Sequence, residues 1–463
     1  MWGSILPLAL ALPCANAITL HRRDDPAVLS FPVTRSDRSH ALQKRSSKTA
    51  STSLYNEQNM YYMVNITLGT PPQNLSLSLD TGSSDIWVNV PNSTYCAADG
   101  DVCSSTGLFD LSDSSTFTLL DYYMNATYVS GSLATGPYAT DTLTIGGATV
   151  KDMQFALAET SSNPHGILGI AYAAGEFAAT EDDKQYSNLP EALVSSGAIN
   201  SAAFSLWLNK FDGTGNLLFG GVNKARYQGE LQTVPMLKVD DEYMTVTIAL
   251  TDVSLKSSSK TKSYTKGLPL AVTLDNGSAF IALPEDLLEP IFKKLGAGYN
   301  ATDGFSYIPC SMSTSDTNVT FSFSGAEVNI PVSELVFDNY VEAGFPEGDC
   351  IFGMVYGEPG VSLMGDPFLR GAYVVYDLAN NEISLADTNY DGGDDDIVEI
   401  GTGTAAVPGA TLMPDPVTSA TGAGSVATAY ATSSKGLGVA AVPTANSNHL
   451  LPGLLGAGLL LAL

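Results

Sequence analysis

Asp80-Thr81-Gly82-Ser83 is the most informative stretch of this sequence, because a second copy, Asp275-Asn276-Gly277-Ser278, stands 195 residues later. Each Asp follows an apolar run that is typical of a strand, residues 75–79 in the first copy and 270–274 in the second. Glycine at the third position lets the backbone turn sharply after the strand. We therefore predict two carboxylates held at the tips of two similar loops.

The similarity between the two halves extends beyond these loops. Ile167-Leu168-Gly169 follows Asp80 and Leu363-Met364-Gly365 follows Asp275, and the spacing from Asp to Gly is 89 residues in one half and 90 in the other. A repeat of motif order and spacing indicates duplicated lobes related by an approximate two-fold axis. Loops that meet on such an axis bring their two carboxylates face to face.

The region between residues 46 and 389 predicts a mostly β fold in two lobes, residues 46–234 and 235–389. Its length suits two domains of about 170 residues each. Short alternating runs broken by Gly, Asn, Asp and Pro are strand signals; they include residues 63–68, 142–145, 245–248 and 319–323. Helix signals are few, and we expect short helices at residues 189–195 and 284–295.

The N-terminal end predicts a secreted precursor. Residues 1–17 are apolar and end in Ala15-Asn16-Ala17, the pattern of a secretory signal peptide. Residues 18–45 are basic and polar and end in Lys44-Arg45, which predicts a propeptide cut at a dibasic site with Ser46 as the mature start. The alternatives are a buried N-terminal helix for the first segment and a flexible basic linker for the second.

The C-terminal end changes composition after residue 389. Residues 390–449 are first acidic and then rich in Gly, Ala, Thr, Ser, Val and Pro, so we expect an extended stalk without a core. Residues 450–463 are apolar but too few to span a membrane as a helix. An apolar tail behind a small-residue spacer predicts GPI attachment, with Ser434 as the proposed acceptor. The alternative is a disordered apolar tail.

The cysteines and sequons agree with secretion. Cys14 leaves with the signal peptide, and the four remaining cysteines allow three pairings, which sequence alone does not distinguish. Proximity favours Cys96–Cys103 and Cys310–Cys350, and an even number of cysteines indicates an oxidising compartment. We expect the sequon at Asn276, inside the second loop, to be unmodified. The other N-glycosylation sequons are Asn65, Asn74, Asn92, Asn125, Asn300 and Asn318.

Charge and composition exclude several classes of function. The chain has 21 Lys and Arg against 48 Asp and Glu, a formal net charge of −27, which excludes nucleic acid as a partner. Of four histidines only His165 lies in the predicted lobes, without evident partners for a Ser-His-Asp triad, and we expect it in a surface turn. No HExxH motif, Cys/His cluster or Gly-rich phosphate loop occurs, so we expect no metal and no organic cofactor.

Carboxylate chemistry remains. Two facing Asp side chains cannot both ionise cheaply, so one pKa falls, the other rises, and the pair holds one proton. A water between them can then give a proton to the ionised Asp and attack a carbonyl, while the protonated Asp donates to the carbonyl oxygen. Two carboxylates could also serve a glycosidase, but symmetric D-x-G-S loops are not the signal of that class.

The chain resembles the pepsin-like aspartic proteases over residues 61–388. The motifs that carry the resemblance are residues 79–88, residues 361–370, and residues 126–132, which look like the flap hairpin of the family. The resemblance implies a bilobal fold with the active-site cleft between the lobes. The signal, dibasic junction, stalk and tail narrow it to yapsin-type fungal members, which are anchored at the cell surface.

The resemblance also implies roles for individual residues. Asp80 and Asp275 would be the catalytic pair, and Ser83 would bond the Asp80 carboxylate. Tyr128 in the flap would close over the substrate. The other implied residues are Gly82, Gly131 and Gly277 for substrate binding, and Thr81, Asn276 and Ser278 for support of the pair.

Two residues depart from the family pattern. Asn276 replaces a Thr or Ser whose hydroxyl bonds the opposite loop, and Ala279 replaces a residue that often bonds the substrate main chain. We predict a secreted, monomeric, GPI-anchored aspartic endopeptidase, made as a zymogen and acting on peptides or proteins at acid pH. The departures keep open a second hypothesis, a catalytically impaired cell-wall or ligand-binding protein. A third is an active enzyme released without an anchor.

Overall fold

The computed structural model describes residues 28–35, 61–98, 102–211, 213–239, 241–337 and 348–421. The predicted signal peptide, the Lys44-Arg45 cleavage site, the mature start at Ser46 and the acceptor Ser434 lie outside the described residues, as does the predicted tail. Within the described ranges, no helix is long and apolar enough to cross a membrane.

The first lobe is built around four strands that position Asp80. Strand β3 (Gln73–Asp80) runs parallel to β9 (Gly166–Gly169), with Asp80 opposite Gly169. Strand β9 is antiparallel to β4 (Ile86–Asn89), which in turn runs parallel to β7 (Ala148–Ala158). The chain therefore leaves β3, turns through the Asp80 loop and returns into the same sheet.

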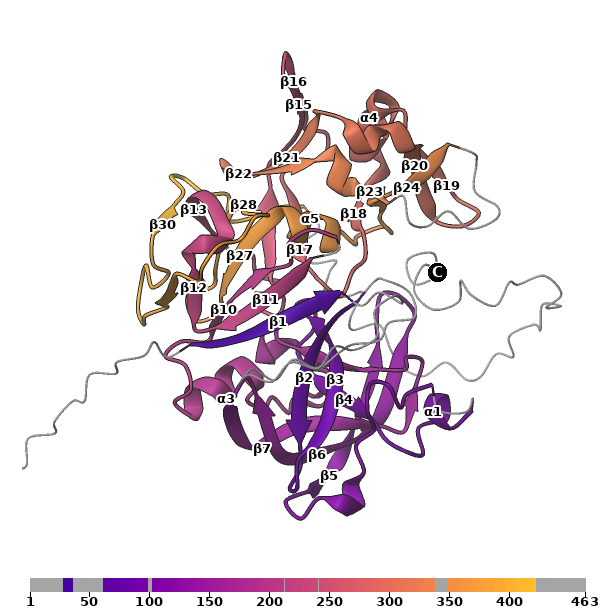
Figure 1. The fold of residues 1–463 in the computed structure, drawn as a ribbon, viewed down its shortest axis with the longest axis vertical. Helices are drawn as coiled ribbons and strands as arrows, with labels where there is room; N and C mark the ends of the chain where they lie inside the picture. Colours follow the sequence, from indigo (N-terminus) through magenta and orange to yellow (C-terminus); the bar gives the residue numbers. More distant parts are fainter. Residues whose placement is uncertain are drawn as a thin grey trace, which may run out of the picture.

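The second lobe repeats this pairing strand for strand. Strand β17 (Leu270–Leu274) runs parallel to β26 (Leu363–Met364), and β26 is antiparallel to β18 (Ile281–Leu283). Strand β18 runs parallel to β25 (Met354–Tyr356). The duplication predicted from the Asp-to-Gly spacing is confirmed, and the two lobes lie one above the other in Figure 1.

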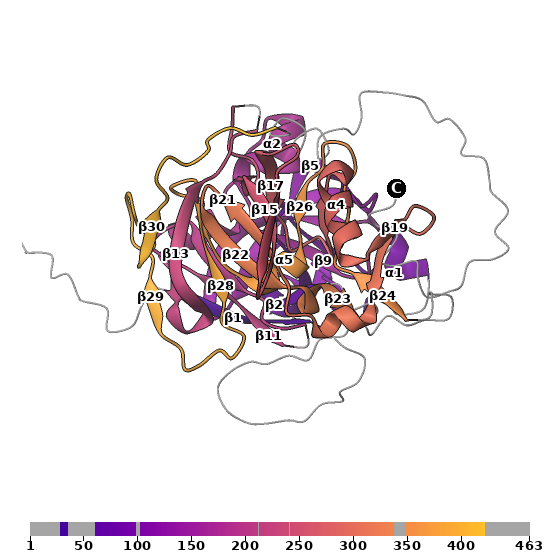
Figure 2. The same cartoon turned by 90° about the horizontal axis from the view of Figure 1, so that it is seen from above.

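A central run of antiparallel strands joins the lobes. Strands β10 (Ala203–Trp207) and β27 (Ala372–Asp377) pair at its middle, with Leu206 opposite Val374. Figure 1 shows both strands in the middle of the molecule, and Figure 2 shows the same fold from above. Strand β1 (Leu29–Arg35) belongs to the predicted propeptide; it pairs with β11 (Thr214–Phe219) and, at Thr34 and Arg35, with β2 (Tyr62–Leu68). The order is β13 (Tyr227–Pro235), β28 (Glu382–Thr388), β27 (Ala372–Asp377), β10 (Ala203–Trp207), β11 (Thr214–Phe219) and β1 (Leu29–Arg35).

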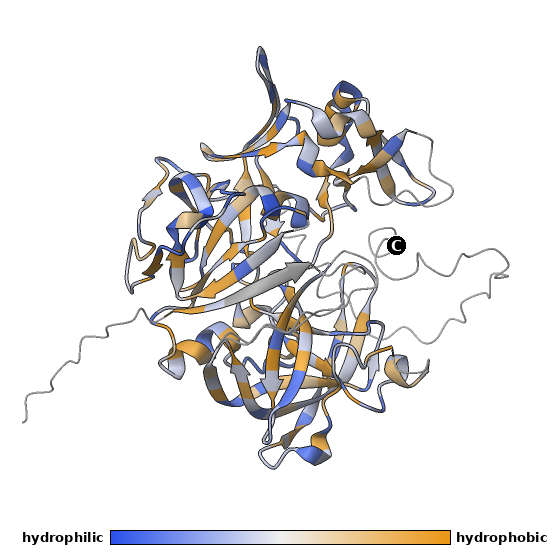
Figure 3. Cartoon of the chain, viewed as in Figure 1, coloured by the Kyte–Doolittle hydropathy of each residue, from blue (hydrophilic) through white to orange (hydrophobic). Residues whose placement is uncertain are grey.

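Apolar side chains from both lobes form one large core. It includes Leu79 and Leu274, which immediately precede the two Asp residues and are fully buried. Hydrophobic and hydrophilic residues alternate along many of the strands, as Figure 3 shows. The two predicted helices are present as α3 (Leu189–Ser195) and α4 (Glu285–Leu295), the second beginning after Pro284.

The disulfides follow the pairing that proximity favours. Cys96 bonds Cys103 and Cys310 bonds Cys350, one bridge in each lobe. All six predicted glycosylation sequons lie at exposed or half-buried positions, and their modification stays a prediction. Asn276 is 1 % exposed and leaves no room for a glycan.

His165 is not in a surface turn, as the sequence suggests. Its ring is 6 % exposed and lies edge-on against Tyr61, with 4.5 Å between the ring centroids. Burial lowers the pKa of His165 to about 4. The residue directly precedes the core strand β9, and its side chain packs in the interior beside this strand and does not face solvent.

Residues 390–421, which we name the C-terminal strap, correct a second prediction. We expected an extended stalk from residue 390, but β29 (Ile397–Glu399) pairs with β12 (Gly221–Asn223), and β30 (Ala410–Leu412) runs parallel to β13. Ile400 is fully buried. A few apolar residues are enough to dock the strap because the lobe already supplies the hydrophobic surface on which they pack.

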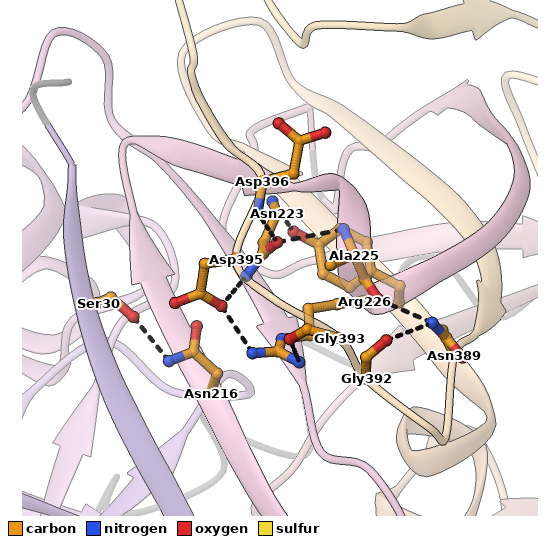
Figure 4. A network of polar contacts seen from close by, with 11 residues as sticks. Ser30, Asn216, Asn223, Ala225, Arg226, Asn389, Gly392, Gly393, Asp395 and Asp396 are labelled. Atoms are coloured by element: carbon orange, nitrogen blue, oxygen red, sulfur yellow. Dashed lines mark hydrogen bonds and ion pairs between the residues drawn. The ribbon is translucent and has the colours of Figure 1, made fainter.

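Polar contacts also fix the strap to the lobe (Figure 4). The Asp395 carboxylate accepts hydrogen bonds from Arg226 at 2.6 Å and from the Asn223 side chain at 2.8 Å. The Asn223 side-chain oxygen accepts from the Asp396 backbone N–H at 3.0 Å. Arg226 also lies over the ring of Trp207, 4.5 Å from its centroid.

Ending the chain after Asn389 is expected to destabilise the protein, whereas ending it after Thr421 is not. The shorter chain loses the buried side chains of Ile400 and Val407, each of which contributes about 1.5–3 kcal/mol. Thermal unfolding of the two truncated proteins, compared with the full chain, measures the difference. Equal Tm values for all three would show that the strap is not part of the folded unit.

Candidate active site

The two predicted catalytic carboxylates occupy equivalent loops. Asp80 is the last residue of β3, and Asp275 directly follows β17. Each side chain is 7 % exposed. The backbone N–H of Gly82 donates to Asp80 Oδ1 at 2.8 Å, and the N–H of Gly277 donates to Asp275 Oδ1 at 2.7 Å. The same turn therefore orients each carboxylate.

The loops are in direct contact across the lobe boundary. A Cβ atom on Gly82 would lie 2.5 Å from Asp275 Cγ, and one on Gly277 would lie 2.8 Å from Asp80 Oδ1. Contacts this short exclude any side chain at the two positions. The carboxyl groups of Asp80 and Asp275 also share a hydrogen bond. The structure thus brings together the residues that the duplicated motif predicts.

Asn276 links the loops in place of the family hydroxyl. Its side-chain oxygen accepts from the Thr81 backbone N–H at 2.9 Å, and its side-chain nitrogen donates to the Leu79 carbonyl at 3.1 Å. In the mirror position, Thr81 Oγ1 accepts from the Asn276 N–H at 3.0 Å and donates to the Leu274 carbonyl at 2.9 Å. The donor and acceptor of the Asn amide therefore do what one hydroxyl does on the other side.

The two loops differ in the residue that follows glycine. Ser83 Oγ donates to Asp80 Oδ2 at 2.5 Å, as the resemblance implies. Ser278 Oγ instead donates to the carbonyl of Phe280 at 3.1 Å, so it stabilises its own turn and not the Asp275 carboxylate. The support predicted for Ser278 is in this respect wrong. Asp80 consequently receives more hydrogen bonds than Asp275.

This difference separates the proton affinities of the pair. Burial raises the pKa of Asp275 well above its ordinary value, and the neighbouring Asp80 charge raises it further. Burial also raises the pKa of Asp80, but hydrogen bonds from Ser83 and Gly82 oppose the rise. Hydrogen bonds to a carboxylate favour its ionised form. The shared proton therefore resides on the Asp275 side and the negative charge on Asp80.

Tyr128 lies in the hairpin that the sequence predicts as a flap. The hairpin is formed by β5 (Thr118–Thr127) and β6 (Leu133–Ile145), and Gly131 occupies its turn with a φ of 77°, a backbone conformation that suits glycine. The Tyr128 hydroxyl accepts a hydrogen bond from Trp87 Nε1 at 2.8 Å. Burial and the nearby Asp80 charge raise the pKa of Tyr128, so its hydroxyl stays protonated.

Two residues beside the site receive no role from the sequence alone. Trp87 is fully buried and holds the Tyr128 hydroxyl. Asp85 is also fully buried, although it lies only five residues after Asp80. A charged residue next to the apolar pair Ile86-Trp87 is the signal that could have indicated a buried, hydrogen-bonded carboxylate.

The sequence comparisons agree with this geometry. The profile of the family described as eukaryotic aspartyl protease matches residues 61–388. The chain belongs to the eukaryotic aspartyl proteases, a family of hydrolases.

Among its relatives, the chain is 43 % identical to the probable aspartic-type endopeptidase opsB of Aspergillus oryzae, over 100 % of this chain and 99 % of that protein. It is 40 % identical to the probable aspartic-type endopeptidase OPSB of Arthroderma benhamiae, with 100 % and 98 % covered. It is 33 % identical to the aspartic proteinase yapsin-3 of Saccharomyces cerevisiae, with 81 % and 74 % covered.

Replacing Asn276 by Ala is expected to lower kcat, whereas Asn276→Thr retains it. The Ala variant leaves the Thr81 N–H and the Leu79 carbonyl without their partner, at about 1–3 kcal/mol for each buried group. Movement of the loops by about 1 Å costs up to about 100-fold in rate. Threonine restores the mirror image of Thr81. Steady-state cleavage of a reporter peptide by both variants and by the wild-type protein tests this role. Wild-type activity in the Ala variant would contradict it.

Stability is expected to fall as pH rises from 6.5 to 9, and to fall less in Glu176→Gln. Burial raises the pKa of Glu176 from 4.5 to about 10, so the folded state holds this proton and the unfolded state does not. Stability from such a group is complete below pH 4.5 and is lost as pH approaches 10. The chosen range lies above the titration of His165, which acts in the opposite direction between pH 6.5 and 4. Melting temperatures of the wild-type protein and the Glu176→Gln variant across this pH range measure the effect. An equal dependence of Tm on pH in the two proteins would contradict it.

Proposed function

We propose that the protein is an aspartic endopeptidase in which Asp80 and Asp275 hydrolyse peptide bonds through a bound water. The contact between the two Asp loops carries this proposal: each Gly lies against the opposite carboxyl group, and the carboxyls share a hydrogen bond. Two buried carboxyls so close retain one proton between them. Membership of the protease family supports peptides or proteins as substrates.

The reaction follows from the unequal carboxyls. The ionised Asp80 accepts a proton from the water, whose oxygen attacks the carbonyl carbon of the peptide bond. The protonated Asp275 donates to the carbonyl oxygen as negative charge develops there. The resulting gem-diol intermediate collapses when the amide nitrogen receives the proton now held by Asp80 and leaves. One hydroxyl of the diol returns its proton to Asp275, so the pair again holds one proton. No covalent bond to the enzyme forms, and no group other than water is required.

Tyr128 and its hairpin supply the second part of the mechanism. A substrate lying across the pair would be covered by the flap, which excludes bulk water from the reacting carbonyl. The hydrogen bond from Trp87 gives the Tyr128 ring one orientation. Gly131 allows the turn at the tip of the flap, and among the described residues an added Cβ there meets no atom within 4 Å. The tip is therefore free to approach a substrate.

Secretion, zymogen processing and GPI anchoring are part of the same proposal. Residues 1–17, the Lys44-Arg45 junction and the apolar tail at 450–463 support them. The two disulfides are in keeping with an oxidising compartment. Treatment of intact cells with a phosphatidylinositol-specific phospholipase should release the protein. Release without the phospholipase would favour a soluble enzyme.

The alternative of a catalytically impaired binding protein rests on Asn276 and Ala279. Asn276 no longer favours it, since its side chain makes both bonds that link the loops. Ala279 removes a hydroxyl but leaves the pair intact. A protein that fails to cleave denatured substrate at about pH 4, while the Asn276→Thr variant succeeds, would support this alternative.

Asp80→Asn and Asp275→Asn are each expected to lower kcat by at least about 100-fold, the usual contribution of a general acid or base. Wild-type activity should show an acid optimum, falling as rising pH removes the shared proton from Asp275 and as falling pH protonates Asp80. Digestion of a peptide library across pH, with and without pepstatin, provides the measurement. Asp286→Asn, which alters an exposed ion pair with Lys266, serves as the control. Substantial activity in either active-site variant would refute the carboxylate mechanism.

A further inference from the structure

Asp85 is a buried carboxylate that the hydrolytic mechanism does not use. It is fully buried and lies in the segment that connects the Asp80 loop to β4. Its backbone carbonyl accepts from the Gly169 N–H at 3.0 Å, so its position relative to the core strand β9 is fixed. A buried charge is stabilised only where several donors surround it, which makes the identity of its donors informative.

Three donors converge on the Asp85 carboxylate from three parts of the first lobe. The hydroxyl of Tyr138, on the flap strand β6, donates to Oδ1 at 2.7 Å. The hydroxyl of Tyr186 donates to the same oxygen at 2.9 Å. The backbone N–H of Phe177, the first residue of helix α2 (Phe177–Asp182), donates to Oδ2 at 2.9 Å. One carboxylate thus joins the catalytic loop, the flap and the α2 segment.

Both sides of Tyr128 are held by residues that Asp85 fixes. The ring of Phe177 lies edge-on against the Tyr128 ring, with 5.9 Å between centroids. On the other side, Trp87, two residues after Asp85, donates to the Tyr128 hydroxyl at 2.8 Å. The Asp85 carboxylate orients Phe177 through its N–H and Trp87 through the chain.

Burial raises the pKa of Asp85, and the hydrogen bonds from Tyr138, Phe177 and Tyr186 oppose this rise and favour its ionised form. Glu176 is fully buried, accepts from the Tyr186 N–H at 2.9 Å, and is protonated because burial raises its pKa to about 10. The hydroxyls of Tyr138 and Tyr186 stay protonated, as do those of Tyr122 and Tyr128, whose pKa values the Asp85 charge also raises. Lys184 lies over the neighbouring Tyr122 ring, 4.1 Å from its centroid, and forms no ion pair with Asp85.

We propose that Asp85 is a positioning residue that holds the flap tyrosine Tyr128 in register with the Asp80 loop. The carboxylate acts through Phe177 and Trp87 and does not itself touch the reacting atoms. The proposal rests on the proposed proteolytic function for its effect on rate, but the geometry it describes exists with or without a substrate. Loss of Asp85 leaves two tyrosine hydroxyls and one backbone N–H without their acceptor and frees Tyr128 to tilt.

Asp85→Ala is expected to lower kcat/KM by at least about tenfold, because displacement of positioning groups by about 1 Å costs up to about 100-fold. Asp85→Asn keeps the shape and one acceptor oxygen and should recover part of the loss. Asp141→Ala is the matched control: Asp141 is also fully buried on β6 and accepts three hydrogen bonds, from Ser114, Thr116 and the Thr142 N–H. Equal losses in the two Ala variants, or less than about twofold loss in Asp85→Ala, would overturn the proposal.

A second readout does not depend on activity. With Trp2 and Trp207 replaced by Phe, Trp87 is the single tryptophan of the chain. Its fluorescence should become more accessible to acrylamide in Asp85→Ala and stay unchanged in Asp141→Ala. An active parent protein with unchanged quenching overturns the positioning role and leaves the proposed function intact. Increased quenching in a protein that cleaves nothing supports the positioning role and counts against the proposed function.

Single hydroxyl deletions keep the test decisive if Asp85→Ala does not fold. Tyr138→Phe and Tyr186→Phe each remove one donor and bury no new charge. Each is expected to lower kcat/KM by about threefold and to raise the quenching of Trp87, with a larger effect when combined. Wild-type values of both quantities in the double variant would overturn the proposal.

Discussion

The structure depends on the contact between two loops that come from opposite lobes. Gly82 and Gly277 allow the loops to approach until each lies against the carboxyl group of the other. Thr81 and Asn276 then cross-link the loop backbones with four hydrogen bonds. Because every one of these bonds is buried, the lobes cannot separate at this point without leaving polar groups unsatisfied. The contact that fixes the relative position of the two lobes therefore also fixes the distance between the two carboxyl groups.

The duplication is nearly symmetric in its backbone and unequal in its side chains. The pairing of β3, β9, β4 and β7 is repeated by β17, β26, β18 and β25. Yet Ser83 donates to its Asp, whereas Ser278 donates to a backbone carbonyl. A symmetric pair would divide its proton evenly. Because Ser278 does not bond Asp275, and because both carboxyls are buried, the proton affinities of Asp80 and Asp275 are unequal.

The sequence predicts what short-range patterns specify and misses what depends on distant partners. The Asp loops, the helices at 189–195 and 284–295, and the disulfide pairing follow from local spacing. The bonding of Asn276 could not be predicted because its partners Thr81 and Leu79 belong to the other lobe. The strap was missed for a related reason. Composition indicates whether a segment can build a core, and Ile400 and Val407 only had to join an existing one.

The path of the C-terminal strap has a consequence for the attachment of the enzyme. Thr421 forms a bridge to Leu270, the first residue of β17, while Asp275 follows the last residue of the same strand. Five residues of β-strand span about 16 Å. Thr421 therefore lies about one strand length from Asp275 and not at the two carboxyls. An attachment made through the residues after Thr421 would thus hold the folded part at a point separate from the two carboxyls.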